Sequence, residues 1–198
     1  MKKIIFVLSV IVFSGFSFIQ SDKVVDYLKQ TGPFSFYGDE FILGRSEHGI
    51  ENYYRQEYLI KGEKHETYNK QIFIELSKTV ISIKDVVNKK VKELENRKKT
   101  DLVCAYTLTD MPTNNEYLLE YITSVGPAKA VKQVEWNVCR YRVFNTAKGD
   151  RFGIQIYGFS MRGYGDYIYN FFDYQKPNKD KIIEAMKSAE YPKIDLGK

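Results

Sequence analysis

The chain has 198 residues, of which 43% are hydrophobic and 15% aromatic, with only five prolines. This composition excludes a largely disordered chain and is sufficient for one domain with a substantial core. The net charge of +5 falls to +3 without Lys2 and Lys3, and the other positive residues are interleaved with acidic ones, so nucleic acid binding is not indicated.

Residues 1–17 have the order of a secretory signal peptide. Lys2 and Lys3 precede an apolar run over residues 4–13, and small residues, Gly15 and Ser17, occupy the positions before a cut. The run is well short of the roughly 20 apolar residues that span a bilayer, which favours cleavage over an uncleaved anchor.

We therefore expect an exported protein, periplasmic or secreted, whose residues 18–198 form a single domain. No cysteine lies at the cut to accept a lipid, and no later segment is apolar enough to span a membrane. The mature chain is expected to lack a transmembrane segment.

The first half of the chain predicts strands followed by one helix. A short helix capped by Asp22 should end at Gly32-Pro33. The following elements are a hairpin around Gly38-Asp39, strands over Asn52–Ile60 and Gln71–Leu76, and a helix over Ile83–Lys98 with Ser82 and Asp85 as a capping pair. The polar-aromatic run ENYYRQEY, at the start of the strand predicted over Asn52–Ile60, is typical of an edge strand with one solvent-exposed face.

The second half returns to strands and ends in a helix. The predicted strands are Leu102–Leu108, Tyr117–Ser124, Gln133–Phe144 and Arg151–Ser160, and the helix begins near Asn178, just after Pro177. Strands that follow one another without regular helical crossovers predict an α+β fold class, with a mainly antiparallel sheet of about six or more strands and flanking helices.

The stretch VEWNVCRYRVF, residues 134–144, changes the parity of its apolar positions. Apolar residues occupy even-numbered positions around Trp136 and odd-numbered positions from Cys139 on. Successive side chains of a regular strand alternate between its two faces, so the apolar residues should have kept one parity. Two explanations remain open: a bulge near Val138-Cys139, or a central strand covered on both faces with Arg140 and Arg142 at its less buried end.

Cys104 and Cys139 are the two cysteines of the chain. An exported protein could bridge them, but in a plain meander the strand at Tyr117 separates theirs, and second-neighbour strands lie about 9–10 Å apart. That spacing exceeds the roughly 7 Å limit between bridged Cα atoms. A disulfide and two buried free thiols both remain open.

Residues 161–174, MRGYGDYIYNFFDY, combine tyrosines and phenylalanines with flexible glycines. They could form a binding surface for a peptide, a glycan or an apolar ligand, or a short helix packed on the sheet. The candidate ligand- or partner-binding residues of the chain come from the late strands and this segment: Trp136, Arg140, Arg142, Arg162, Tyr164 and Tyr167.

No stretch is a specific catalytic, metal or nucleotide motif. His65-Glu66 lacks the second histidine of HExxH, because Asn69 occupies that position, and the spacing around Ser160 is GxSxxG rather than that of a nucleophile elbow. The sequence therefore assigns no catalytic residue, no metal ligand and no cofactor.

The order of elements, together with the pattern EYLxxGExxxxY from Glu57 to Tyr68, resembles a family of uncharacterised exported bacterial proteins. It also resembles the PsbP-like α/β/α sandwich, in which helices flank an antiparallel sheet. Members of that fold generally act as non-enzymatic binding or assembly factors, so the resemblance implies binding rather than catalysis.

The predicted function is an exported, non-catalytic binding or assembly-type domain whose partner is an unknown protein, peptide or glycan, and not a nucleic acid. The alternative is a small secreted or periplasmic hydrolase or inhibitor-type module that uses Glu63, His65 and Glu66.

Overall fold

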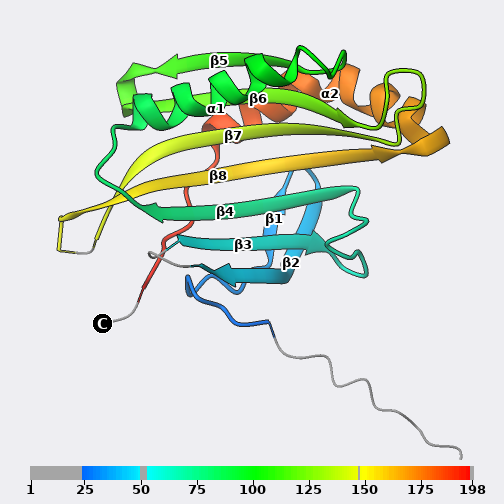
Figure 1. The fold of residues 1–198 in the computed structure, drawn as a ribbon. Coiled ribbons are helices and arrows are strands. Elements are labelled where there is room, and N and C mark those ends of the chain that lie inside the picture. The colour runs from blue at the N-terminus through cyan, green and yellow to red at the C-terminus, as the bar shows by residue number, and fades with distance from the viewer. Residues whose placement is uncertain (1–23, 50–52, 147, 197–198) are drawn as a thin grey trace, which may run out of the picture.

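The structure is a computed structural model, and it describes residues 24–49, 53–146 and 148–196. Its central feature is one open antiparallel sheet of eight strands in the order β1-β2-β3-β4-β8-β7-β6-β5 (Figure 1). The strands are β1 Phe34–Phe36, β2 Asp39–His48, β3 Tyr53–Ile60, β4 Lys70–Lys78, β5 Ala105–Met111, β6 Glu116–Val125, β7 Gln133–Asn145 and β8 Arg151–Tyr164. The α-helices are α1 Ile83–Arg97 and α2 Ile168–Ser188.

The chain builds the sheet from both edges towards the middle. Strands β1 to β4 form a meander, after which α1 carries the chain to the opposite edge, where β5 begins a second meander. Strand β8 then joins the two meanders by pairing with β7 on one side and with β4 on the other. Its pairing with β4 runs in register from Lys78↔Gly153 to Lys70↔Met161.

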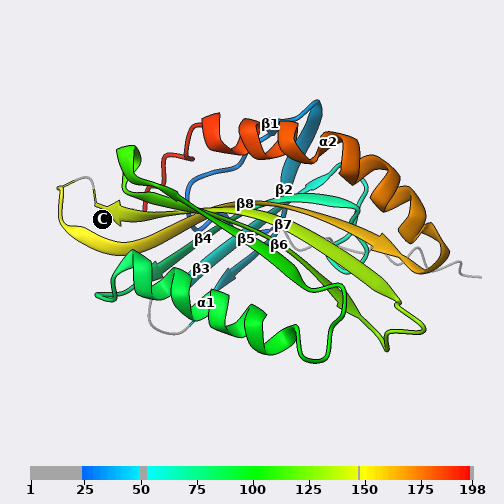
Figure 2. The same cartoon turned by 90° about the horizontal axis from the view of Figure 1, so that it is seen from above.

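The two helices lie on opposite faces of the sheet (Figure 2). Helix α2 packs on β7 and β8, and with the segments before β1 and after α2 it covers the larger hydrophobic core, which contains Trp136 and Phe159. Helix α1 packs on β5, β6 and β7 over a smaller core that contains Phe73 and Leu119. We call these the α2 face and the α1 face.

The expected fold class, an α+β domain on about six or more strands with a PsbP-like sandwich, is corrected by the structure. Strands make up 44% and helices 25% of the described residues, so the chain is mostly one open eight-stranded sheet with two helices flanking it. The expected short helix before Pro33 does not form over residues 24–33, and its cap Asp22 lies outside the described residues, as does the expected signal peptide.

Helix α1 matches its predicted bounds to one residue because its signals are local. The Ser82 hydroxyl oxygen accepts a hydrogen bond from the Asp85 backbone N–H at 3.1 Å, as an N-cap does. Its buried residues, Ile83, Val87 and Leu94, recur at helical spacing and face the sheet.

Helix α2 starts ten residues earlier than predicted and contains Pro177. Proline removes one backbone donor, but the side chain of Asn178 donates to the Tyr174 carbonyl at 2.8 Å. Phe171, before the proline, and Met186, after it, both pack into the core on the α2 face, so burial holds the two halves as one helix.

The parity change in β7 does not mark a bulge. The strand pairs with β6 and β8 without a register shift from Gln133 to Phe144, and the one irregularity lies between Phe144 and Asn145. The second explanation is correct for the strand, because β7 is a central strand with a helix on each face and both parities are buried, but it is wrong in placing Arg140 at a less buried end.

Among the described residues, no helix is both long enough and apolar enough to cross a membrane.

Candidate functional site

Three of the sequence-predicted binding residues lie together on the α2 face and are used by the fold. Trp136 is 1% exposed, and its indole N–H donates to Glu120 at 2.8 Å. Arg140 is buried, and the Arg142 guanidinium carbon lies 3.9 Å from the centre of the Tyr191 ring. The structure therefore places these side chains under α2 and the C-terminal segment.

Arg140 links the sheet to the end of α2. Its guanidinium donates to Glu116 Oε2 at 2.7 and 3.1 Å and to the carbonyls of Met186 and Ala189 at 3.0 and 2.6 Å. These carbonyls belong to the last turn and the C-cap of α2, which lack intrahelical partners. Arg140 is accordingly a helix cap, and it does not lie at the less buried end expected from the sequence.

The other predicted residues lie on the opposite face or at a loop. Arg162 is on the α1 face, with its guanidinium carbon 4.0 Å from the centre of the Tyr68 ring. The Tyr164 hydroxyl donates to the Tyr68 carbonyl at 2.9 Å, and Tyr167 is 74% exposed in the short turn before α2. The structure thus does not bring the six predicted residues into one site.

Both cysteines are free and buried, so the structure contains no bridge between them. Cys139 lies on β7, while Cys104 immediately precedes β5, and β6 separates the two strands as the meander argument required. Burial raises the pKa of the Cys139 thiol to about 12, which keeps it protonated.

A concave feature lies on the α1 face, along the side of α1 that faces β4. We call it the α1 groove. Its volume is about 420 Å³, and it lies between the helix and the half of the sheet that the helix leaves uncovered. Its lining comes from α1 and five strands: Arg55, Phe73, Glu75, Ser77, Val86, Lys89, Lys90, Glu93, Tyr121, Glu135, Asn137, Cys139, Tyr141 and Ile156.

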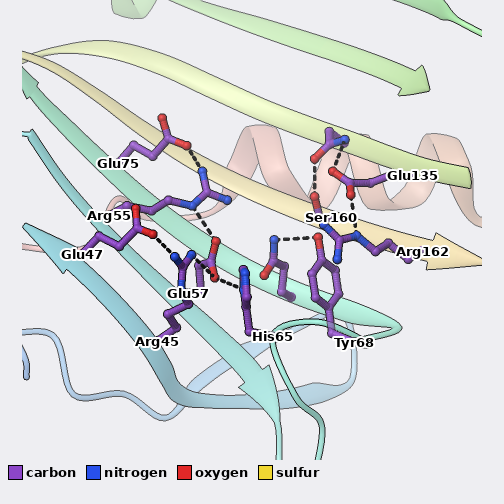
Figure 3. Close-up of polar contacts among 12 residues, drawn as sticks. Arg45, Glu47, Arg55, Glu57, His65, Tyr68, Glu75, Glu135, Ser160 and Arg162 are labelled. Atoms are coloured by element: carbon purple, nitrogen blue, oxygen red, sulfur yellow. Dashed lines mark hydrogen bonds and ion pairs between the residues drawn. The ribbon is translucent and has the colours of Figure 1, made fainter. Parts of the chain in front are cut away.

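Beside the groove, alternating charges cross β2, β3 and β4 (Figure 3). We call Glu47, Arg45, Glu57, Arg55 and Glu75 the ion-pair ladder. Glu57 binds Arg55 Nε at 2.6 Å and Arg45 Nη1 at 3.4 Å, while Arg45 also contacts Glu47 and Arg55 contacts Glu75. The five side chains lie on the same face of three neighbouring strands, and the register of these strands places opposite charges next to each other.

Glu57 is the enclosed member of the ladder, at 2% exposed. Burial alone would raise the pKa of its carboxyl, but the charges of Arg55, His65 and Arg45 outweigh burial and hold that pKa below its usual value. The His65 ring contacts the same carboxylate through Nδ1, which ties the β3–β4 loop to β3.

The residues of the alternative hydrolase do not form a catalytic group together. His65 faces Glu57 rather than Glu66, which lies on the exposed surface. Glu63 accepts hydrogen bonds from the backbone and side chain of Asn69 at 3.2 and 2.8 Å, so it stabilises the β3–β4 turn.

A chain of hydrogen bonds links the same loop to the groove wall (Figure 3). Gln71 Nε2 donates to the Tyr68 hydroxyl at 2.8 Å, and that hydroxyl also bonds Ser160. Ser160 donates to Asn137, whose amide donates to Glu135 at 3.1 Å. Asn137 and Glu135 therefore enter the groove in orientations that their neighbours fix.

Glu135 is held from its other side by Arg162, whose Nε donates to it. Of the six predicted binding residues, Arg162 therefore supports the groove by holding Glu135, although it does not line the groove.

Within the described ranges, no cluster of histidine, cysteine and carboxylate side chains could hold a metal ion. The groove offers charged, amide, hydroxyl and aromatic groups, which suit reversible binding. Sequence reasoning missed Arg55 because ENYYRQEY was read as an edge strand, whereas β3 is an interior strand between β2 and β4. The alternation of Arg55 and Glu57 with buried Gln56 and Tyr58 was the available signal.

Comparison with known proteins gives a family but no characterised relative. No curated protein and no solved structure matches the chain significantly. The model of an uncharacterised protein family matches residues 28–191, which run from the segment before β1 to just beyond α2. The chain therefore belongs to this uncharacterised family.

Proposed function

We propose that the chain is an exported, non-catalytic binding or assembly-type domain and that its ligand or partner group occupies the α1 groove. The observation that carries this proposal is the groove itself. Its volume of about 420 Å³ falls within the roughly 300–1,000 Å³ of typical ligand sites, and its lining combines a majority of polar and charged side chains with aromatic and aliphatic ones.

The groove lining is held in place before any ligand arrives. Arg55 is fixed by Glu57 and Glu75, Glu93 pairs with Lys90 at 3.4 Å, and Glu135 is bonded to Asn137. Fixed side chains lose little conformational freedom on binding, which lowers the cost of association.

The chemistry of the groove favours binding over catalysis. Its one thiol, Cys139, is buried and has a pKa raised to about 12, so it is not a thiolate nucleophile at neutral pH. The nearby His65 is engaged with Glu57 and does not line the groove.

Export is supported by the order of residues 1–17, in which two lysines precede an apolar run and small residues. The intact mass of the protein isolated from the native compartment tests this. We expect a species that begins after Ser17, and a full-length chain retained in the cell would contradict export.

Binding in the groove is tested with two matched charge reversals on α1. Lys90→Glu changes the groove lining, where Lys90 lies 5.3 Å from the Tyr121 ring centre, whereas Lys92→Glu makes the same charge change outside that lining. In pull-downs from the native compartment, we expect partners that the wild type and Lys92→Glu retain to be lost with Lys90→Glu. Equal recovery with both variants would contradict a groove site.

A further inference from the structure

We propose that the ligand of the α1 groove has an apolar or aromatic body with one anionic group, and that Lys89 binds this group. The inference rests on the proposed binding function and specifies the chemical class of the ligand. It follows from the ion pairs that the charged lining residues already form and from the apolar side chains that line the groove beside them.

The carboxylates of the groove are all paired within the protein. Glu75 pairs with Arg55, and Glu93 pairs with Lys90. Glu135 pairs with Arg162, which lies outside the lining. A cationic ligand would have to displace one of these partners, and it would leave an arginine or lysine without its counter-charge.

Lys89 is the exception among the charged residues of the groove. It is exposed on α1, it lines the groove, and it has no charged partner among the residues that the structure describes. The three cations of the lining, Arg55, Lys89 and Lys90, balance its three carboxylates, and Lys89 is the charged lining residue that no ion pair of the described chain engages. An anionic group on the ligand is therefore the group that this site attracts without breaking an existing pair.

Aromatic and apolar side chains form one part of the lining, which we call the floor, among a larger number of polar and charged ones. Phe73, Tyr121, Tyr141 and Ile156 contribute to it, and the Arg55 guanidinium carbon lies 4.6 Å from the centre of the Phe73 ring. Burial also raises the pKa of Tyr121 and Tyr141, so both hydroxyls stay neutral. A ring or aliphatic chain can lie on this floor while its anionic group reaches the helix.

Two fluorescent naphthalene probes separate the two parts of the proposal. 1-Anilinonaphthalene-8-sulfonate carries an aromatic body with one anionic group, and N-phenyl-1-naphthylamine has a similar aromatic body without charge. Both probes are titrated into the wild type and three variants, Lys89→Glu, Lys92→Glu and Val86→Trp. Circular dichroism checks that each variant is folded. The neutral probe reports on the floor alone, and the sulfonate reports on the floor and the charge.

We expect both probes to bind the wild type and both to bind more weakly to Val86→Trp, whose larger side chain fills the groove. We expect Lys89→Glu to weaken binding of the sulfonate about 1.5- to fivefold, the range for an exposed charge pair, and to leave the neutral probe unchanged. Lys92→Glu should change neither, and added salt should weaken sulfonate binding to the wild type and to Lys92→Glu more than to Lys89→Glu.

The outcomes that overturn the inference are distinct. If Val86→Trp weakens both probes but Lys89→Glu does not selectively weaken the sulfonate, the groove binds ligands and the anionic class is wrong. If neither probe binds, or Val86→Trp affects neither, the groove is not a binding site, and the proposed function fails together with the inference.

Discussion

The two faces of the sheet use charge in different ways. On the α2 face, Arg140 and Glu116 are buried as one pair, and their side chains are 5% and 9% exposed. On the α1 face, the ion-pair ladder runs across strands that no helix covers, and only Glu57 is enclosed. The comparison teaches that arginines three or four strands apart in one sheet can cap a helix end on one face and form an ion-pair ladder beside a groove on the other.

The largest expected effect is on the α2 face. Arg140→Ala leaves the Glu116 carboxylate buried without its cation and the carbonyls of Met186 and Ala189 without their donor. Breaking one partner of a buried pair costs about 3–5 kcal/mol, so we expect the free energy of unfolding in urea to fall by that amount. A loss below about 1 kcal/mol would show that the two faces do not differ as described.

The next effect tests the groove floor. An alanine Cβ at position 158 would lie 2.2 Å from Cζ of Phe73, whose ring must then move. We expect Gly158→Ala to lower the free energy of unfolding by about 1–3 kcal/mol and to change probe binding, because Phe73 lines the groove.

Gly49→Ala is the matched control for that substitution. Its new Cβ meets Tyr53 at an ordinary contact distance of 3.5 Å, so a change within about 0.5 kcal/mol is expected. Equal losses in the two variants would mean that the Phe73 contact is not the cause.

The third effect concerns pH and the enclosed member of the ladder. Because the pKa of folded Glu57 is held below its unfolded value of about 4.3, its contribution to stability is present above that pH and is lost as pH falls through the folded pKa. We expect Glu57→Gln to cost about 1–2 kcal/mol at neutral pH and progressively less in acid. Urea unfolding at several pH values measures the difference in free energy of unfolding between the wild type and Glu57→Gln. If this difference grew as the pH fell, the pKa of folded Glu57 would be raised and not lowered.

The smallest effect is expected at the open end of the ladder. The Arg45 and Glu47 side chains are 36% and 40% exposed, and exposed pairs contribute about 0–1 kcal/mol. Glu47→Gln should therefore lower stability by less than about 0.5 kcal/mol, and salt should remove the difference. A larger, salt-independent loss would place this pair with the buried charges of the other face.

The sequence predicted those elements whose signals are local. Ser82, Asp85 and the helical spacing of buried residues defined α1, and the turn at Gly38 defined the first hairpin. The start of α2 was placed ten residues too late because Pro177 is a local helix breaker, whereas the packing of Phe171 and Met186 against the sheet is not a local signal.

The candidate site depends on pairing that single strands do not encode. Arg55 approaches Glu75 only because β3 lies beside β4, and Glu135 approaches Arg162 only because β8 returns beside β7. The stretch at residues 134–144 has an unusual composition, which drew attention to Trp136, Arg140 and Arg142. The helix that covers this stretch lies more than 25 residues later in the chain, so no local sequence signal indicated its burial.

The position of β8 also affects the order in which the protein can assemble. This strand is the last of the eight to be synthesised, yet it is the only link between the β1–β4 and β5–β7 meanders. Neither meander can complete the sheet until residues 151–164 are available, and contacts between such distant segments form slowly. The two meanders thus remain unjoined until the C-terminal quarter of the chain has been synthesised, which makes completion of the sheet a late step in folding.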